Sequence, residues 1–295
     1  MDTPGPADSH FGHALREYAA AGFSGVLRAD GRPGGTVYFA DGQISACATP
    51  GAPGLEVILL RSGRISESDW NAAFLAAAVG GRPMTADLVE SGLLGAGEAE
   101  ALLRTALADA VFAILSGPVD DWTEAPAEDC LLPLVPPARC GWLLGEAARR
   151  AQVLASFPQP ALTARDRIAA APTPPDRVPA PGQDEILVLA DGRRTPRDLA
   201  FGLGRGLYET MLHLARMRAA NLVEVSPSSR TAASAPVTAV TPAEKEAEPA
   251  GGLPRRRRDR PGAPRLGETS LRNIAANIGL LRPRAEGSTT PGGAR

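Results

Sequence analysis

The feature that most constrains the fold is a pair of turn signals between short apolar runs near the N-terminus. Asp41-Gly42 separates TVYFA from QISACA. Asp-Gly between two apolar runs favours a tight hairpin, because both central residues of such a turn take positive φ. A cluster of turn-forming residues over 30–35 separates TVYFA from the preceding run, SGVLRAD. These runs therefore predict a three-stranded antiparallel meander.

Apolar residues at helical spacing surround this meander. The run FGHALREYAAA precedes it, and Gly22 follows as the expected C-terminal cap. Ser66 is expected to cap a helix over 67–79, because a serine hydroxyl can accept a backbone N–H of the first turn. Residues 1–125 are therefore predicted to form an α+β domain, a small antiparallel meander with helical hairpins. The other helices expected in it cover residues 53–61, 85–91 and 97–116.

The next two segments differ in composition. Residues 126–183 are predicted to be a joining helix followed by a semi-extended linker, because seven prolines lie between Pro158 and Pro181. Residues 184–225 contain two helical segments, a glycine-bearing turn between them and a short strand after them. This order predicts a winged-helix-like module. We expect the module to pack on the joining helix or on the N-terminal body, because 42 residues are few for an independent domain.

The charge of the chain is distributed unevenly. Residues 1–225 carry nineteen arginines against twenty-seven acidic residues, a net charge of −8. Residues 226–295 carry eleven arginines and one lysine against six acidic residues, a net charge of +6. An acidic body with a basic tail is typical of a partner-binding protein. This last segment is rich in Pro, Ala, Ser and Arg and is predicted to be a disordered tail.

Two patterns stand out within the tail. One is a dense run of cations that could hold phosphate groups or an acidic partner, and the other is an apolar stripe with the spacing of one helix face. The stripe is typical of a short segment that folds in a partner's groove. The cations are Arg255, Arg256, Arg257, Arg258 and Arg260, and the stripe is Leu271, Ile274, Ile278 and Leu281.

The meander carries a family resemblance. The segments Ser24-Gly25-Val26-Leu27, Val37-Tyr38-Phe39, Asp41-Gly42-Gln43-Ile44 with Ala46, and Gly54-Leu55-Glu56 resemble the bacterial PATAN-like domain. Residues 187–195, LVLADGRRT, resemble the winged-helix segment often attached behind it. The resemblance covers about residues 10–225. It implies a non-enzymatic module of bacterial signalling, whose relatives occur with response-regulator receivers, small GTPases and roadblock-type partners.

Signals for catalysis, cofactor binding or metal binding are few. The cysteines are odd in number and lack CxxC spacing, and the histidines have no third ligand nearby. No apolar run has the length of a membrane span, and the N-terminus lacks a secretory signal. We therefore expect a reduced cytoplasmic protein that is not an enzyme, without cofactor or metal. The residues concerned are His10, His13, His213, Cys47, Cys130 and Cys140, while Gly202-x-Gly204-x-Gly206 is predicted to be a turn between helices.

Two functional hypotheses remain. The first is a regulatory protein that acts by protein–protein contacts of the meander domain. The second is a DNA-binding transcriptional regulator that uses the helix-turn-helix at 195–221 together with the basic tail. Against DNA binding, residues 184–225 contain six arginines and six acidic residues, and a neutral module gains little from counterion release. The candidate contacts in the helix-turn-helix, to DNA or to a protein partner, are Arg205, Tyr208, Arg216 and Arg218.

Overall fold

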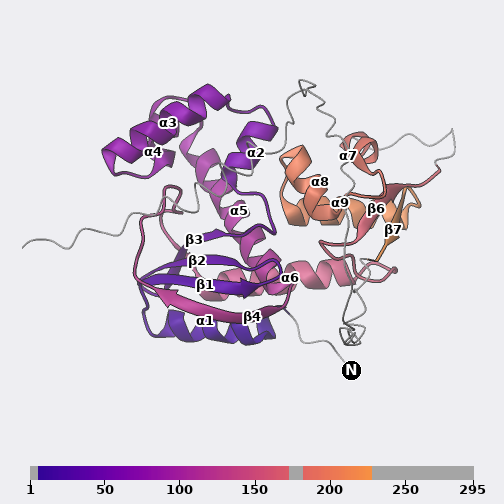
Figure 1. The fold of residues 1–295 in the computed structure, drawn as a ribbon, viewed down its shortest axis with the longest axis horizontal. Coiled ribbons are helices and arrows are strands. Elements are labelled where there is room, and N and C mark those ends of the chain that lie inside the picture. Colours follow the sequence, from indigo (N-terminus) through magenta and orange to yellow (C-terminus); the bar gives the residue numbers. More distant parts are fainter. Residues whose placement is uncertain (1–5, 173–181, 228–295) are drawn as a thin grey trace, which may run out of the picture. The chain divides into compact units, whose positions relative to one another are not determined.

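The computed structural model describes residues 6–172 and 182–227, which all belong to one compact unit (Figure 1). The fold is mixed α+β, as predicted, with a five-stranded antiparallel sheet, a two-stranded antiparallel sheet and several helices. The tail cations and the 271–281 stripe lie outside the described residues. The described elements are η1 (Pro6–Asp8), α1 (His10–Ala20), β1 (Gly25–Gly31), β2 (Gly35–Ala40), β3 (Gln43–Ala48), α2 (Leu55–Arg61), α3 (Glu67–Gly80), α4 (Met84–Glu90), α5 (Ala96–Leu115), β4 (Val119–Ala125), β5 (Ala138–Arg139), α6 (Cys140–Ala155), β6 (Arg167–Ala170), α7 (Gln183–Leu189), α8 (Pro196–Leu203), α9 (Leu207–Ala219) and β7 (Val223–Ser226).

The predicted meander is confirmed as β1–β2–β3. Its second turn has positive φ at both central residues, 49° at Asp41 and 73° at Gly42. The Ser24 hydroxyl accepts the backbone N–H of Asp41 at 2.8 Å and so fixes this turn to the start of β1. The sheet also contains two strands that the sequence analysis missed, in the order β4-β1-β2-β3-β5. The sequence of β4, VDDWTEA, has three acidic residues and no apolar alternation, and β5 has only two residues.

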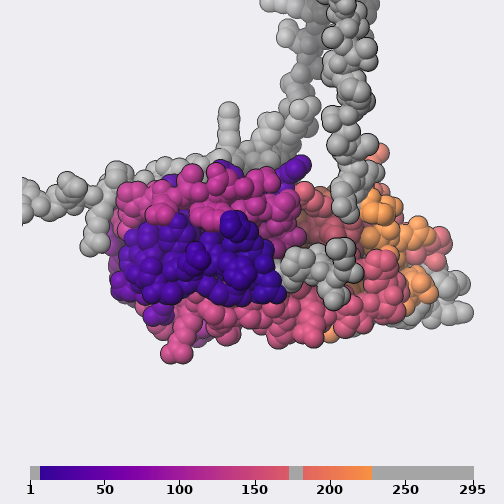
Figure 2. Space-filling model, turned by 90° about the horizontal axis from the view of Figure 1, so that it is seen from below, coloured from indigo at the N-terminus to yellow at the C-terminus, as the bar shows by residue number. Residues whose placement is uncertain are grey.

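The core lies between the inner face of this sheet and the helices α1, α5 and α6. Leu27 and Phe39 project from the sheet into this core, where Leu15 of α1 is also buried. At the β4 edge of the sheet, the Phe11 and Trp122 rings lie 5.6 Å apart, so α1 also covers part of β4. Figure 2 shows the indigo surface of N-terminal residues directly against a magenta surface formed by residues from farther along the chain.

The stretch 126–183 differs from its prediction. The joining helix is confirmed as α6, but it packs against α5 and α1, and β5 just before it pairs with β3. The prediction of a semi-extended linker between Pro158 and Pro181 is wrong for residues 167–170, which form β6 and pair with β7. The prolines of this stretch do not prevent a strand from forming, because the four residues of β6, RIAA, include no proline.

The helix-turn-helix docks on the rest of the compact unit, as expected. α9 contacts α5 and α6, and α8 contacts α2. Gly204, which ends α8, has a φ of 64°, and a Cβ added there would lie 2.6 Å from Cβ of Arg61 at the end of α2. Glycine at this position therefore provides both the left-handed cap and the close approach of the two helices.

Candidate interaction surfaces

α8 and α9 form the helix-turn-helix that the sequence predicts, and local chemistry fixes where each helix begins. The Thr195 hydroxyl accepts the N–H of Asp198 at 3.2 Å, while the Asp198 carboxylate accepts the N–H of Thr195 at 3.1 Å. This reciprocal capping box defines the start of α8. Gly204 ends α8 and Gly206 precedes α9, so the glycine motif is a turn between helices, as predicted.

A carboxylate from a different helix caps the N-terminus of α9. Gly206 stands at the N-cap position and has no side chain to accept a hydrogen bond. Asp109 of α5 takes this role, with Oδ1 accepting the N–H of Tyr208 at 3.4 Å. A Cβ at position 206 would lie 2.6 Å from the other carboxylate oxygen of Asp109. The unpaired N–H groups and partial positive charge of a helix start favour a carboxylate there.

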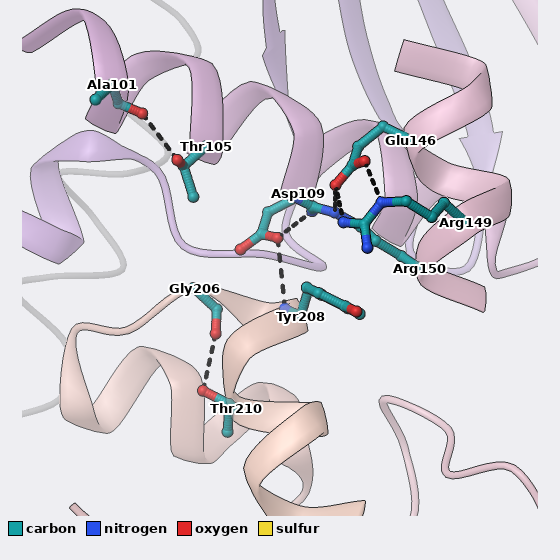
Figure 3. A network of polar contacts seen from close by, with 9 residues as sticks. All are labelled: Ala101, Thr105, Asp109, Glu146, Arg149, Arg150, Gly206, Tyr208 and Thr210. Atoms are coloured by element: carbon teal, nitrogen blue, oxygen red, sulfur yellow. Dashed lines mark hydrogen bonds and ion pairs between the residues drawn. The ribbon is translucent and has the colours of Figure 1, made fainter. Parts of the chain in front are cut away.

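Asp109 belongs to a buried ionic network that joins three helices (Figure 3). The carboxylate of Asp109 pairs with the guanidinium of Arg150 on α6, and the two residues are 1% and 6% exposed. Nε of Arg150 also donates to Glu146 at 2.8 Å, and Nε of Arg149 donates to the second oxygen of Glu146 at 2.7 Å. One acid of α5 therefore connects the start of α9 to a chain of charges along α6.

The ring of Tyr208 packs against this ionic network. The guanidinium carbon of Arg150 lies 4.8 Å from the centre of the Tyr208 ring, within cation–π range. The ring also makes an edge-type contact with the ring of Phe112 on α5, with ring centres 6.0 Å apart and an interplanar angle of 77°. Tyr208 thus packs between α5 and α6, and its aromatic face is occupied by a residue of the same chain.

The carboxyl groups of this network titrate in different environments. Burial raises the pKa of Asp109, while Arg150 and the N–H groups of Leu207 and Tyr208 act in the opposite direction. Hydrogen bonds from Arg149 and Arg150 lower the pKa of Glu146 to about 2. The network is therefore formed by a buried capping acid and a charged carboxylate closer to the surface.

Most of the predicted contact residues of the helix-turn-helix are engaged within the chain. Arg205 donates to the carbonyl of Gly182 at 3.0 Å and to Glu185 at 2.6 Å, and Nη1 of Arg218 donates to the carbonyl of Pro160 at 3.0 Å. Tyr208 lies in the junction with α5 and α6. Arg216 is exposed. Three of these four candidates therefore hold the fold together, and one faces solvent.

The outer face of α9 carries opposite charges. Glu209 and Arg216 are exposed, and Oε1 of Glu209 lies 4.0 Å from Nε2 of His213. The inner face is buried along most of the helix. In the first turn, which a DNA-reading helix would present to the major groove, Leu207 and Thr210 are buried and the exposed side chain is the acidic Glu209. The buried residues of α9 are Leu207, Thr210, Met211, Leu214, Ala215 and Met217.

A candidate surface that the sequence analysis missed lies on α3. This helix is apolar on both faces: three residues are buried, and the face turned to solvent carries four apolar side chains. Leu75 is 62% exposed and Val79 is 90% exposed. A helix that is apolar all round is normally covered on all sides, so an exposed apolar face marks a contact surface. The buried residues are Trp70, Ala73 and Ala77. The exposed apolar residues that share one side of the helix, which we call the α3 face, are Ala72, Leu75, Ala76 and Val79, and Ala78 is exposed beside them.

A recess of about 440 Å³ lies on the outer side of the five-stranded sheet, beneath the segment that precedes β5. Tyr38 and the carboxylates of Asp41, Glu128 and Asp129 are among its lining residues. Glu128 pairs with Arg28 through one oxygen, while its second oxygen is buried without a hydrogen-bond partner. The carboxylates make this recess unfavourable for an anion.

Within residues 6–172 and 182–227, no cluster of His, Cys, Asp and Glu has the arrangement of a metal site. The cysteines are free, and burial raises the pKa of the Cys140 thiol to about 11 and that of Cys47 still further. In the same described ranges, no helix combines the length and apolarity needed to cross a membrane.

Comparison with known proteins gives no match to a family model, to a curated protein or to a solved structure.

Proposed function

We propose that this chain is a non-enzymatic regulatory protein that acts by protein–protein contacts, and that the α3 face is the apolar centre of its contact surface. The observation that carries the proposal is the exposure of Leu75 and Val79 on a helix whose opposite side is packed in the core. Removing apolar side chains from water is favourable, and side chains gathered on one exposed helix face are removed from water only when a partner covers them.

The contacts that α9 makes within the chain favour a role in protein binding over a role in reading DNA. The N-terminus of this helix is capped by the buried Asp109. Arg205, just before the first turn, is held by the carbonyl of Gly182 and by Glu185, and Arg218 in the last turn is held by the carbonyl of Pro160. A DNA-reading helix needs its N-terminal side chains free to reach base edges. The exposed charges of α9, Glu209 and Arg216, also cancel.

The resemblance to the PATAN-like domain supplies the partner class. We expect a receiver, a small GTPase or a roadblock-type protein of a bacterial signalling system, and cytoplasmic action follows from that class. The contact would place an apolar groove or helix of the partner on the α3 face.

A binding assay with purified full-length chain tests this proposal. We expect one member of a panel of receivers, small GTPases and roadblock-type proteins from the same genome to bind. Leu75→Asp with Val79→Asp should weaken binding at least tenfold, because burying two carboxylates is costly. The control, Val135→Asp with Val188→Asp, changes side chains that are 67% and 82% exposed elsewhere and should leave binding unchanged. Equal loss in both double variants would contradict the assignment of the α3 face.

DNA binding is the alternative, and a mobility-shift assay across a salt series separates it. We expect the full-length chain to bind random duplex and its own upstream DNA equally, and only at low salt, because the tail cations act without sequence preference. Preference for one duplex at physiological salt, lost in Arg216→Ala, would make the protein a transcriptional regulator.

A further inference from the structure

We infer that the recess on the outer side of the five-stranded sheet binds an aliphatic ammonium group, and that a ligand with two such groups binds best. The recess has a volume of about 440 Å³, and small-molecule sites typically measure about 300–1,000 Å³. None of its lining residues belongs to α3, so its ligand would bind independently of a partner on the α3 face.

Two polar groups at this recess lack a hydrogen-bond partner in the described part of the chain. Tyr38 is only 8% exposed, and its hydroxyl makes no hydrogen bond with residues 6–172 or 182–227. Oε2 of Glu128 is buried and likewise unpaired, because Arg28 holds only Oε1. A buried polar atom without a partner costs free energy, so these two atoms together point to a ligand that donates hydrogen bonds.

Both groups can accept hydrogen bonds from a cation. Burial raises the pKa of Tyr38, so its hydroxyl is neutral at pH 7 and its oxygen retains lone pairs that can accept. The free oxygen of the Glu128 carboxylate can only accept. An ammonium group has three N–H donors and no acceptor, so one such group can satisfy both atoms and bind a third.

The charge of the recess favours a ligand with two positive charges. Asp41, Glu128 and Asp129 line the recess, and the described lining residues include no lysine, arginine or histidine. Arg28, which pairs with Glu128, offsets one of these three negative charges. Two negative charges remain, and a diamine would balance them.

The walls of the recess are held in place by hydrogen bonds within the chain. The N–H of Leu134 donates to the carbonyl of Ser45 at 2.7 Å, which attaches the segment 133–135 to β3. The Ser24 hydroxyl donates to Oδ1 of Asp41 at 3.1 Å, so this carboxylate is fixed as well. The segment 133–135, Pro-Leu-Val, supplies apolar surface for the methylene groups between two ammonium groups.

Calorimetric titration of the full-length protein tests the site with three probes that share a four-carbon chain. These are 1,4-diaminobutane, butylamine and 1,4-butanediol, which carry two, one and no positive charges. We expect the diamine to bind at least fivefold more tightly than butylamine, and the diol to give no measurable binding. Absence of diamine binding at about 10 mM, or equal binding of all three probes, would overturn the inference.

Variants show whether the diamine binds in the recess. Tyr38→Phe should weaken diamine binding several-fold without changing the urea midpoint, because the lost hydroxyl has no partner in the described chain. Asp41→Asn with Asp129→Asn should weaken binding at least tenfold, and asparagine accepts the φ of 49° at position 41. The control, Asp120→Asn with Asp121→Asn, removes the same charge from β4 and should change the affinity less than twofold.

Equal losses in the two double variants would mean that the overall charge of the protein attracts the diamine, and would overturn the inference. Unchanged affinity in both Tyr38→Phe and Asp41→Asn with Asp129→Asn would place the diamine elsewhere and would overturn it as well.

A lysine side chain of another protein carries the same chemistry as a free amine, and a fourth probe separates these two sources. This probe is a tripeptide with blocked ends and a central lysine. Weaker binding of the tripeptide than of the diamine supports a free diamine as the ligand. Tighter binding of the tripeptide, lost in Asp41→Asn with Asp129→Asn, would support the ammonium site but overturn its preference for a diamine.

Discussion

The helices α9 and α3 show opposite relations between sequence and surface. α9 carries basic residues and follows a helix-turn-helix turn, yet its N-terminus is capped by the buried Asp109. Arg205 before the helix and Arg218 in its last turn bind carbonyl groups of the same chain. α3 consists mostly of small and apolar residues, yet Leu75 and Val79 face solvent. Residue type alone therefore does not separate a binding helix from a structural one, because available partners within the fold decide which side chains remain free.

The largest effect should come from removing the acid that anchors α9. Asp109→Ala leaves the guanidinium of Arg150 buried with one of its two carboxylate partners missing, which should destabilise the protein by about 3–4 kcal/mol. Urea unfolding followed by tryptophan fluorescence measures this loss. On the same helix, Glu100 pairs with Arg104 at the surface at 2.7 Å, and Glu100→Ala should cost less than about 0.5 kcal/mol. Similar losses in both variants would mean that the Asp109 junction has no special role.

A smaller loss should follow from filling the space between α9 and Asp109. In Gly206→Ala the added Cβ would meet Oδ2 of Asp109, while Arg150 holds the same carboxylate through Oδ1, so we expect a loss of about 2 kcal/mol. Gly145→Ala is the matched control: this glycine lies within α6, and a Cβ there meets nothing within 4 Å. That change should stabilise by up to about 1 kcal/mol, because alanine favours a helix. Calorimetric melting of both variants, with opposite shifts in Tm, tests the difference.

The network should also make stability depend on pH through Glu146. Its pKa is about 2 in the folded protein and about 4.5 when unfolded, so its charged form stabilises the fold above pH 4.5. This contribution is lost as pH falls from about 4.5 toward 2. Glu146→Gln should therefore cost about 1–2 kcal/mol at pH 7, and the difference from the wild type should vanish near pH 2. A constant difference between pH 7 and pH 2.5, measured by urea unfolding, would exclude this origin.

The smallest effect should be seen on the α3 face. Leu75→Ser and Val79→Ser should each change the free energy of unfolding by less than about 0.5 kcal/mol, since both side chains are exposed. Leu88→Ala in the adjacent helix α4 is the internal reference, and loss of this fully buried side chain should cost about 2–4 kcal/mol. A cost above 1 kcal/mol for either serine variant would show that the α3 face is packed in the protein.

Local signals in the sequence were sufficient for many elements. The Asp41-Gly42 turn predicts the β2–β3 hairpin because few other sequences accept two positive φ angles in succession. Ser66 and Thr195 correctly predict the starts of α3 and α8, since each accepts the N–H of the residue three positions later. Where a hydrogen bond or a turn involves only three or four consecutive residues, the sequence pattern predicts it directly.

Elements that depend on distant residues were missed. β4 and β6 pair with strands about 90 and 55 residues away along the chain, and neither has an alternating apolar pattern of its own. The role of Asp109 has no local signal either, because its hydrogen-bond partner, the N–H of Tyr208, lies 99 residues away. The α3 face could have been found, since NAAFLAAAVG is apolar at nearly every position, which is more than one buried face requires.

The sequence by itself determined the α+β composition, the turns, the helix starts and the contrast between an acidic body and a basic tail. Only the tertiary structure decided which charges are already paired and which apolar side chains remain uncovered. The physical reason is that ion pairing and burial depend on distance in space, and the chain brings Asp109, Arg150 and Tyr208 together only after folding.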